Sequence, residues 1–222
     1  MGANLGPKIV RTGLILELDA ADINSYIGTG TNWRDMANNN NGTLTNGPTF
    51  NSGNGGSIVL DGVDDFVNLP LVSSSIATIT MSIWFNTATL PGNKSLFYNG
   101  VGASNGYGFS FGSGGTNTTL YVFFGSVSLD VVRFANIQNN IWYNAVYTRR
   151  TTPSVLDSLY INGILQSTNT LFTPLTPTVS TVLSRSTASL SGKISIASMY
   201  NRELTANEIL QNYNAVKSRF GL

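Results

Sequence analysis

The chain of 222 residues is only 10% charged and contains neither cysteine nor histidine. Without cysteine there are no disulfides and no thiolate metal sites, and without histidine the usual general base and the usual zinc ligand are missing. The net charge of +1 gives no indication of a nucleic-acid partner. No apolar run has the length of a membrane span, so we expect no membrane partner either.

The beginning of the chain predicts a strand followed by a long, turn-rich excursion. Residues 1–12 are expected to form an irregular N-terminal arm, and residues 13–19 alternate so that three leucines share one face of a strand. Residues 24–48 are rich in asparagine and glycine, and long loops of this kind are often functional or tightly packed. We expect Trp33 and Leu44 to anchor this excursion to the sheet.

A strand, a tight acidic turn and a second strand are predicted over residues 56–70. Apolar runs at 58–60 and 66–69 flank residues 61–65, which read Asp-Gly-Val-Asp-Asp. Glycine supplies positive φ in such a turn, and aspartate side chains accept local backbone N–H bonds. Residues 78–85 then alternate and predict the next strand.

Further short strands follow through the second half of the chain. They are expected at residues 96–99, 107–111, 120–125, 142–149 and 193–200. Asn162-Gly163 lies between two apolar runs and predicts a hairpin with a two-residue type I′ turn. Residues 170–181 contain Pro174 and Pro177 and are expected to form an edge or a loop.

One helix is predicted near the C-terminus. Thr205 and Glu208 have the spacing of a capping box, and Ile209, Tyr213 and Val216 recur at helical spacing on one face. Many short strands and one late helix predict an all-β fold, a jelly-roll sandwich of two antiparallel sheets with a short C-terminal helix packed on it.

Three segments of the sequence together resemble one known family. Residues 61–67 resemble the Asp-Gly-x-x-Asp-Tyr/Phe-Val/Ile segment of laminin-G-like domains in the concanavalin A-like lectin/glucanase superfamily. Residues 14–48 and 192–209 resemble the variant of this domain found in phage structural proteins. The resemblance implies a single laminin-G-like jelly-roll domain over residues 13–222, after the arm.

A pair of carboxylates in the first predicted strand is a candidate catalytic site. Alternation places Glu17 and Asp19 on one face, as a retaining glycosidase requires. However, Asp22 stands where glucanases of this superfamily have a glutamate, and no histidine is present for a lyase. We therefore expect no catalytic residues and no enzymatic activity, with Glu17 and Asp19 as a solvent-facing or hydrogen-bonded pair.

The acidic turn raises the question of a metal. Asp61, Asp64 and Asp65 could supply carboxylate oxygens to Ca²⁺, which relatives of this fold carry at a rim of the sandwich. Aspartate in turns, however, usually accepts backbone N–H bonds. We expect no cofactor, and calcium at these three residues is the alternative.

Sugar binding needs exposed aromatic rings with polar groups beside them. Trp33, Tyr98 and Tyr107 lie in or beside predicted loops and are the candidate glycan-binding residues. Burial in the core is the alternative for each, because large aromatic side chains are buried on average.

The resemblance to the phage group leads to a functional hypothesis. It implies a non-enzymatic virion structural or decoration protein, assembled in the host cytoplasm and displayed on a capsid or tail fibre. Its partners would be other virion proteins and a cell-surface glycan. A free carbohydrate-binding, lectin-like module is the alternative, and a glycanase is the third interpretation.

Overall fold

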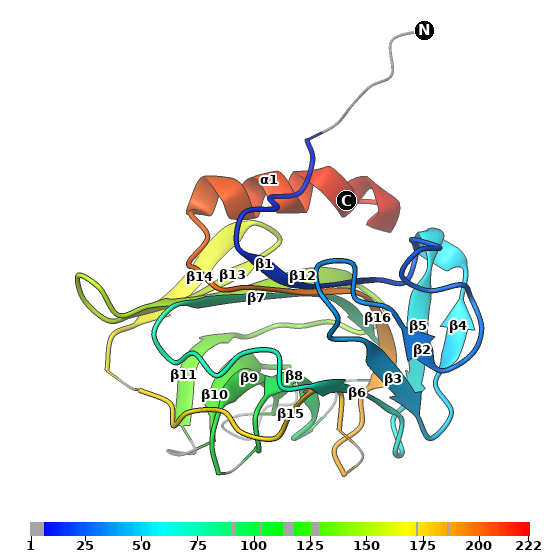
Figure 1. Cartoon of the computed structure of the whole chain (residues 1–222), viewed down its shortest axis with the longest axis horizontal. Coiled ribbons are helices and arrows are strands. Elements are labelled where there is room, and N and C mark those ends of the chain that lie inside the picture. The colour runs from blue at the N-terminus through cyan, green and yellow to red at the C-terminus, as the bar shows by residue number, and fades with distance from the viewer. Residues whose placement is uncertain are drawn as a thin grey trace, which may run out of the picture.

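The structure is a computed structural model that describes residues 7–89, 92–102, 104–112, 118–125, 129–171, 173–185 and 187–222, with only the backbone of residues 129 and 130. Two antiparallel sheets of eight strands face each other, and one α-helix covers the outer side of the first sheet (Figure 1). The expected all-β sandwich with a short C-terminal helix is therefore confirmed. The first six residues of the expected arm lie outside the described residues.

Sheet A is built around its long strand β16 (Ser191–Tyr200). Its members are β1 (Leu14–Asp19), β4 (Thr49–Asn51), β5 (Ser57–Asp61), β7 (Ile79–Thr87), β12 (Trp142–Arg150), β13 (Leu156–Ile161), β14 (Ile164–Asn169) and β16 (Ser191–Tyr200). Their order is β14-β13-β12-β7-β16-β5-β4. Strand β16 pairs with β5 through residues 191–194 and with β1 through residues 196–200. Strand β16 thus connects β1, at the beginning of the chain, with β5 in the same sheet.

Sheet B lies below sheet A in Figure 1. Its members are β2 (Asn32–Trp33), β3 (Gly42–Thr45), β6 (Phe66–Pro70), β8 (Ser95–Asn99), β9 (Tyr107–Phe111), β10 (Leu120–Phe124), β11 (Leu129–Phe134) and β15 (Ser180–Leu183), in the order β11-β10-β9-β8-β15-β6-β3-β2. The expectation of an edge or loop over residues 170–181 is wrong for its last two residues. Pro174 and Pro177 lie in the preceding loop, so β15 itself has the free N–H groups that an interior strand needs.

The core lies between the sheets because the strands alternate. In β10, Leu120, Val122 and Phe124 are buried, whereas Tyr121 and Phe123 are only partly buried and face outward. The expected loop anchors are confirmed as well, since Trp33 is fully buried and Leu44 is 4% exposed. Each apolar side chain buried in this way contributes about 1.5–3 kcal/mol.

Helix α1 (Ala206–Val216) begins and packs as the sequence predicts. The capping box is complete, since Thr205 Oγ1 accepts from the Glu208 backbone N–H and the Glu208 side chain accepts from the Thr205 backbone N–H. Ile209 is buried, and the Tyr213 ring stacks on Trp84 at 5.6 Å. A 3₁₀ turn, η3 (Lys217–Phe220), follows the helix, and another, η1 (Gly53–Gly55), precedes β5.

The hairpin between β13 and β14 has the expected turn. Asn162 has φ 52° and Gly163 has φ 79°, so both central residues are left-handed, as a type I′ turn requires. A Cβ at Gly163 would lie 3.1 Å from Cδ1 of Leu210, which places the turn against helix α1. The hairpin prediction is confirmed.

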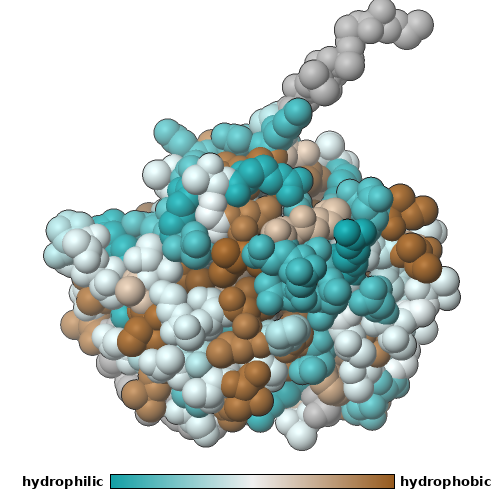
Figure 2. Space-filling view, viewed as in Figure 1, coloured by the Kyte–Doolittle hydropathy of each residue, from teal (hydrophilic) through white to brown (hydrophobic). Residues whose placement is uncertain are grey.

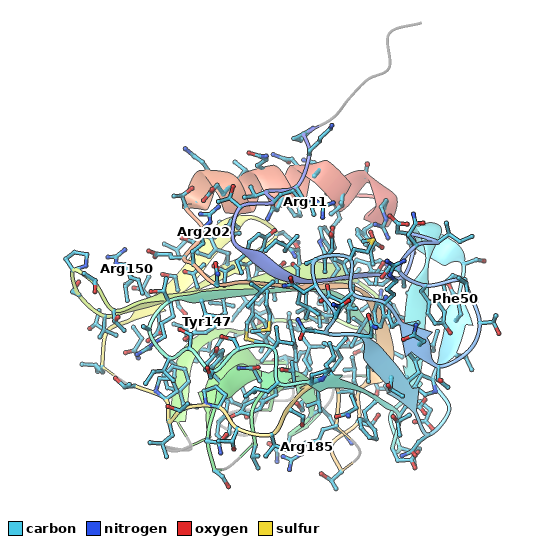
Figure 3. The ribbon with its side chains drawn as sticks, viewed as in Figure 1. Arg11, Phe50, Tyr147, Arg150, Arg185 and Arg202 are labelled. Carbon is cyan, nitrogen blue, oxygen red and sulfur yellow. The ribbon has the colours of Figure 1, made fainter. Side chains whose placement is uncertain are left out.

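A buried ion pair lies between the sheets, and no pattern in the sequence indicated it. Arg149 and Asp157 are register partners on β12 and β13, and both side chains are fully buried. Nη1 of Arg149 lies 2.7 Å from both carboxylate oxygens, and the hydroxyl of Tyr147 (labelled in Figure 3) donates to Oδ1 of Asp157 at 2.6 Å. Sheet A therefore carries a polar cluster whose members all have hydrogen-bond partners.

The surface in the view of Figure 2 mixes polar, neutral and apolar residues, and the apolar ones form several separate patches. The exposed large apolar side chains include Ile23, Ile27, Val63, Ile164, Leu165, Leu171, Leu175, Val179 and Leu210. The described part of the chain contains no helix that combines the length and the hydrophobicity of a membrane span.

Candidate functional site

A groove runs over the outer face of sheet B, on the opposite side of the molecule from helix α1. It encloses about 400 Å³ and is lined by residues of β8, β9, β10 and β15, of the segment before β8 and of the segments after β8 and β15. We call it the sheet-B groove. Its aromatic and basic side chains are Lys94, Tyr98, Tyr121, Phe123 and Arg185, and Ser110 adds a hydroxyl.

Strand register explains why aromatic rings meet in this groove. Phe123 pairs with Gly108, Gly108 pairs with Tyr98, and Tyr98 pairs with Val182, so these residues form one row across four strands. A Cβ at Gly108 would lie 2.8 Å from Cδ2 of Tyr98, closer than real contacts allow. Gly108 therefore lets the Tyr98 ring lie over β9, with its centroid 6.2 Å from that of Phe123.

The neighbouring row adds a second aromatic ring and a hydroxyl. Tyr121 pairs with Ser110, and both are partly exposed. The rings of Tyr121 and Phe123 lie 6.2 Å apart and nearly perpendicular, at 84°. The sheet-B groove thus combines apolar ring surface with the Ser110 hydroxyl.

Tyr98 forms the floor of the groove and presents little ring surface. It is 3% exposed, and its hydroxyl donates to the carbonyl of Asn105 at 2.9 Å. Burial raises the pKa of Tyr98, so its hydroxyl stays a neutral donor. Of the three aromatic residues expected from the sequence, Tyr98 is the one that lines the groove.

The other two expected aromatic residues lie in the core. Trp33 and Tyr107 are both 0% exposed. The Tyr107 hydroxyl donates to the carbonyl of Ser75, and burial raises its pKa to about 12. Of the two alternatives left open for these rings, exposure for stacking on a sugar is therefore wrong, and burial in the core is what the structure shows. Tyr121 and Phe123 are the partly exposed rings of the groove instead, and the alternation of β10 was the signal that could have identified them.

Two basic side chains lie along the sheet-B groove. Lys94 precedes β8, and Arg185 follows β15 on the outer side of sheet B (Figure 3). A Cβ at Gly102 would lie 2.7 Å from Nη1 of Arg185, so the guanidinium reaches over the β8–β9 loop. None of the lining residues that the structure describes is acidic.

The acidic turn between β5 and β6 brings its three carboxylates together. One oxygen from each of Asp61, Asp64 and Asp65 lies within 4.8 Å of the others. Two oxygens of the turn already have partners, because Oδ1 of Asp61 accepts from the backbone N–H of Val63 at 2.8 Å and Oδ2 of Asp65 accepts from that of Asp61 at 3.0 Å. Burial raises the pKa of Asp65. Hydrogen bonds within the turn account for the side chains of Asp61 and Asp65, and calcium at the three aspartates stays the alternative.

A second, smaller pocket of about 230 Å³ lies between sheet A and helix α1 and includes Glu17 and Asp19. Glu17 is paired with Arg11, and burial raises the pKa of Glu17. Asp19 accepts from Nη1 of Arg219 at 2.7 Å and from Nη2 at 3.0 Å. Both carboxylates are therefore held in ion pairs, which agrees with the interpretation of a hydrogen-bonded pair.

The sequence of this chain matches the model of a known protein family. The family model described as the Concanavalin A-like lectin/glucanases superfamily matches residues 61–210, more than half of the chain. A search of curated protein sequences found no significant match.

Solved structures share the fold at low sequence identity. Domain 4 of AbnA, an extracellular arabinanase from Geobacillus stearothermophilus solved in complex with arabinotriose, is 21% identical with a TM-score of 0.71 over 90% of this chain and 98% of that one. The binding domain of botulinum neurotoxin serotype D is 14% identical with a TM-score of 0.71 over 92% of this chain and 52% of that one. Trypanosoma rangeli sialidase is 17% identical with a TM-score of 0.69 over 93% of this chain and 33% of that one. This chain thus spans about half of the neurotoxin domain and a third of the sialidase.

Proposed function

Because the chain belongs to the Concanavalin A-like lectin/glucanases superfamily, we propose that it is a non-catalytic glycan-binding domain carried by a phage virion. The sheet-B groove is the proposed glycan site. The observation that carries this proposal is the pair of partly exposed rings, Tyr121 and Phe123, beside the Ser110 hydroxyl in one groove.

The size and composition of the groove suit a short oligosaccharide. Its volume of about 400 Å³ lies within the range of small-molecule sites. The apolar C–H faces of a sugar ring pack on aromatic surface, and sugar hydroxyls exchange hydrogen bonds with groups such as Ser110 and the exposed amide of Asn93. The arabinanase domain, which shares this fold and has nearly the same length, was solved with an oligosaccharide, which supports the same role here.

Several features support the absence of catalysis. Glycoside hydrolysis uses two carboxyl groups that flank the bond to be cleaved. The described lining of the sheet-B groove contains no carboxyl group, and Glu17 and Asp19, on the opposite side of the molecule, are each paired with an arginine. The sequence also has no histidine to act as a general base.

The virion assignment rests on sequence resemblance and on surface chemistry. Residues 14–48 and 192–209 resemble the variant of the domain found in phage structural proteins. Assembly in the host cytoplasm and display on a capsid or tail fibre follow from this proposal. Ile164, Leu165 and Leu210, which are 65%, 50% and 44% exposed, offer apolar surface to a neighbouring virion protein.

The glycan role is tested with the isolated chain on a glycan array, followed by titration of any ligand found. We expect Phe123→Ala to weaken binding by about tenfold or more, because it removes ring surface from the groove. Phe50→Ala is the matched control, since Phe50 is a partly buried ring on β4 that does not line the groove and lies far from Arg185 in Figure 3. Binding that Phe123→Ala leaves intact, or no glycan binding at all, contradicts the proposal.

A free carbohydrate-binding module is the second candidate, and the likeness to the arabinanase domain favours it. The two functions differ in where the protein resides. Peptides of this chain in mass spectra of purified virions support the virion role. Their absence from virions, combined with glycan binding by the free chain, supports the module.

A further inference from the structure

The basic side chains of the sheet-B groove have no acidic partners. Among the described residues, neither the Lys94 ammonium nor the Arg185 guanidinium has an ion pair or a hydrogen bond. Several arginines elsewhere in the fold are paired with carboxylates, among them Arg149, Arg202 and Arg219. The groove therefore concentrates positive charge on a chain whose net charge is only +1.

A third cation extends this charge along the same face of sheet B. Arg133 on β11 is the register partner of Tyr121, so both side chains lie on the outer face. Arg133 is exposed. The aromatic wall of the groove is thus flanked by Arg133 on the edge strand and by Lys94 and Arg185 along the lining.

Hydrogen bonds constrain the backbone at both ends of β15, the strand that leads to Arg185. Val179 and Ser184, on either side of β15, have φ of 79° and 61°, which is costly for non-glycine residues and most of all for a β-branched one. Beside Val179, the backbone N–H of Thr178 donates to Oδ1 of Asn105 at 3.1 Å. At Ser184, the side-chain Oγ accepts from the backbone N–H of Leu190 at 2.9 Å. Arg185 therefore projects from a backbone that its neighbours constrain.

We infer that the ligand of the sheet-B groove is an acidic saccharide, with a carboxylate or sulfate group beside the ring that packs on Tyr121 and Phe123. This inference rests on the proposed glycan function and names its ligand class. A guanidinium and an ammonium bind such anions through charge-assisted hydrogen bonds, and they would offer a neutral sugar much less. The small groove and the low net charge favour one anionic sugar over a long polyanion such as nucleic acid.

The test compares acidic saccharides with their neutral counterparts by isothermal titration. The probes are oligogalacturonate, sialyllactose and a sulfated disaccharide, with lactose as the neutral probe and single-stranded DNA as the polyanion. Arg185→Gln and Lys94→Gln should each weaken binding of the preferred acidic probe by about tenfold, the value expected for one charge-assisted hydrogen bond. Lys8→Gln, which removes an exposed charge from the N-terminal arm, should leave binding unchanged.

Each outcome separates this inference from the proposed function. Tighter binding of an acidic than of the neutral saccharide, lost in Arg185→Gln and retained in Lys8→Gln, supports the inference, and the three acidic probes tell carboxylate from sulfate. Equal or tighter binding of neutral sugars, unaffected by Arg185→Gln, overturns the acidic ligand and leaves the glycan function standing. Tighter binding of DNA, or equal losses in Lys8→Gln, shows general attraction of polyanions and overturns it as well. Arg185 and Lys8 are exposed and Lys94 is partly exposed, and melting temperatures that match the unaltered chain confirm that the three variants fold.

Discussion

Replacing either partner of the buried pair Arg149–Asp157 is expected to destabilise the fold by about 3–5 kcal/mol, because each single change leaves one charge buried without its partner. Both side chains are fully buried, and the guanidinium also donates from Nε to the carbonyl of Ile76 at 2.7 Å. Burial raises the pKa of Asp157 although Arg149 lies beside it, so loss of solvent outweighs the attraction of the guanidinium. The pair is therefore a costly arrangement that depends on both members.

Arg149→Met and Asp157→Leu together should cost less than either change alone, since no unpaired charge remains. The reference protein, both single variants and the double variant all carry Tyr147→Phe. Otherwise the Tyr147 hydroxyl, which donates to Asp157, would lose its acceptor when Asp157 is replaced. Urea unfolding followed by tryptophan fluorescence gives the free energy of unfolding of each variant. If the two single losses add within about 0.5 kcal/mol, the two residues are not coupled and the reasoning is refuted.

Three further results are expected from helix α1 and the acidic turn. Ile209→Ala should lower the free energy of unfolding by about 2–4 kcal/mol through lost burial and a cavity, whereas Asn214→Ala should change it by less than about 0.5 kcal/mol; equal effects in urea unfolding would show that the helix does not pack through Ile209. The Arg202 guanidinium lowers the pKa of Glu208 from 4.5 to about 2, so ionised Glu208 stabilises the fold above pH 4.5 and this contribution is lost as the pH falls toward 2. Thermal melts should therefore show a smaller loss over that range for Glu208→Gln than for the unaltered chain, and parallel curves would contradict the assignment. Chelation with EDTA should leave the melting temperature unchanged; a drop of several degrees that calcium restores would make Asp61, Asp64 and Asp65 a metal site.

Much of the fold was predictable because local patterns carry it. The Asn162-Gly163 turn and the capping box at Thr205 each depend on residues close in sequence. The strands β4 and β11 were missed because their residues lack such a pattern, and pairing with a neighbour decides their conformation. The placement of β15 inside sheet B was missed for the same reason.

The candidate site was harder to predict because it depends on register across strands. Phe123, Gly108 and Tyr98 are brought together by pairing between β8, β9 and β10, and no single segment contains that information. Loop position alone suggested Trp33 and Tyr107, which the sandwich buries. Alternation within a strand, which separates Phe123 from Phe124, proved the better guide to exposure.

The outer face of sheet B is the proposed glycan-binding surface, and one measurement tests this most directly. Titrating the ¹⁵N-labelled chain with the tightest oligosaccharide from the array, and following amide chemical shifts, locates the site directly. We expect the largest shifts at Ser110, Tyr121, Phe123 and Arg185, which line the sheet-B groove. Shifts concentrated instead at Asp61–Asp65, or around Glu17 beneath helix α1, would place the ligand elsewhere and contradict this assignment.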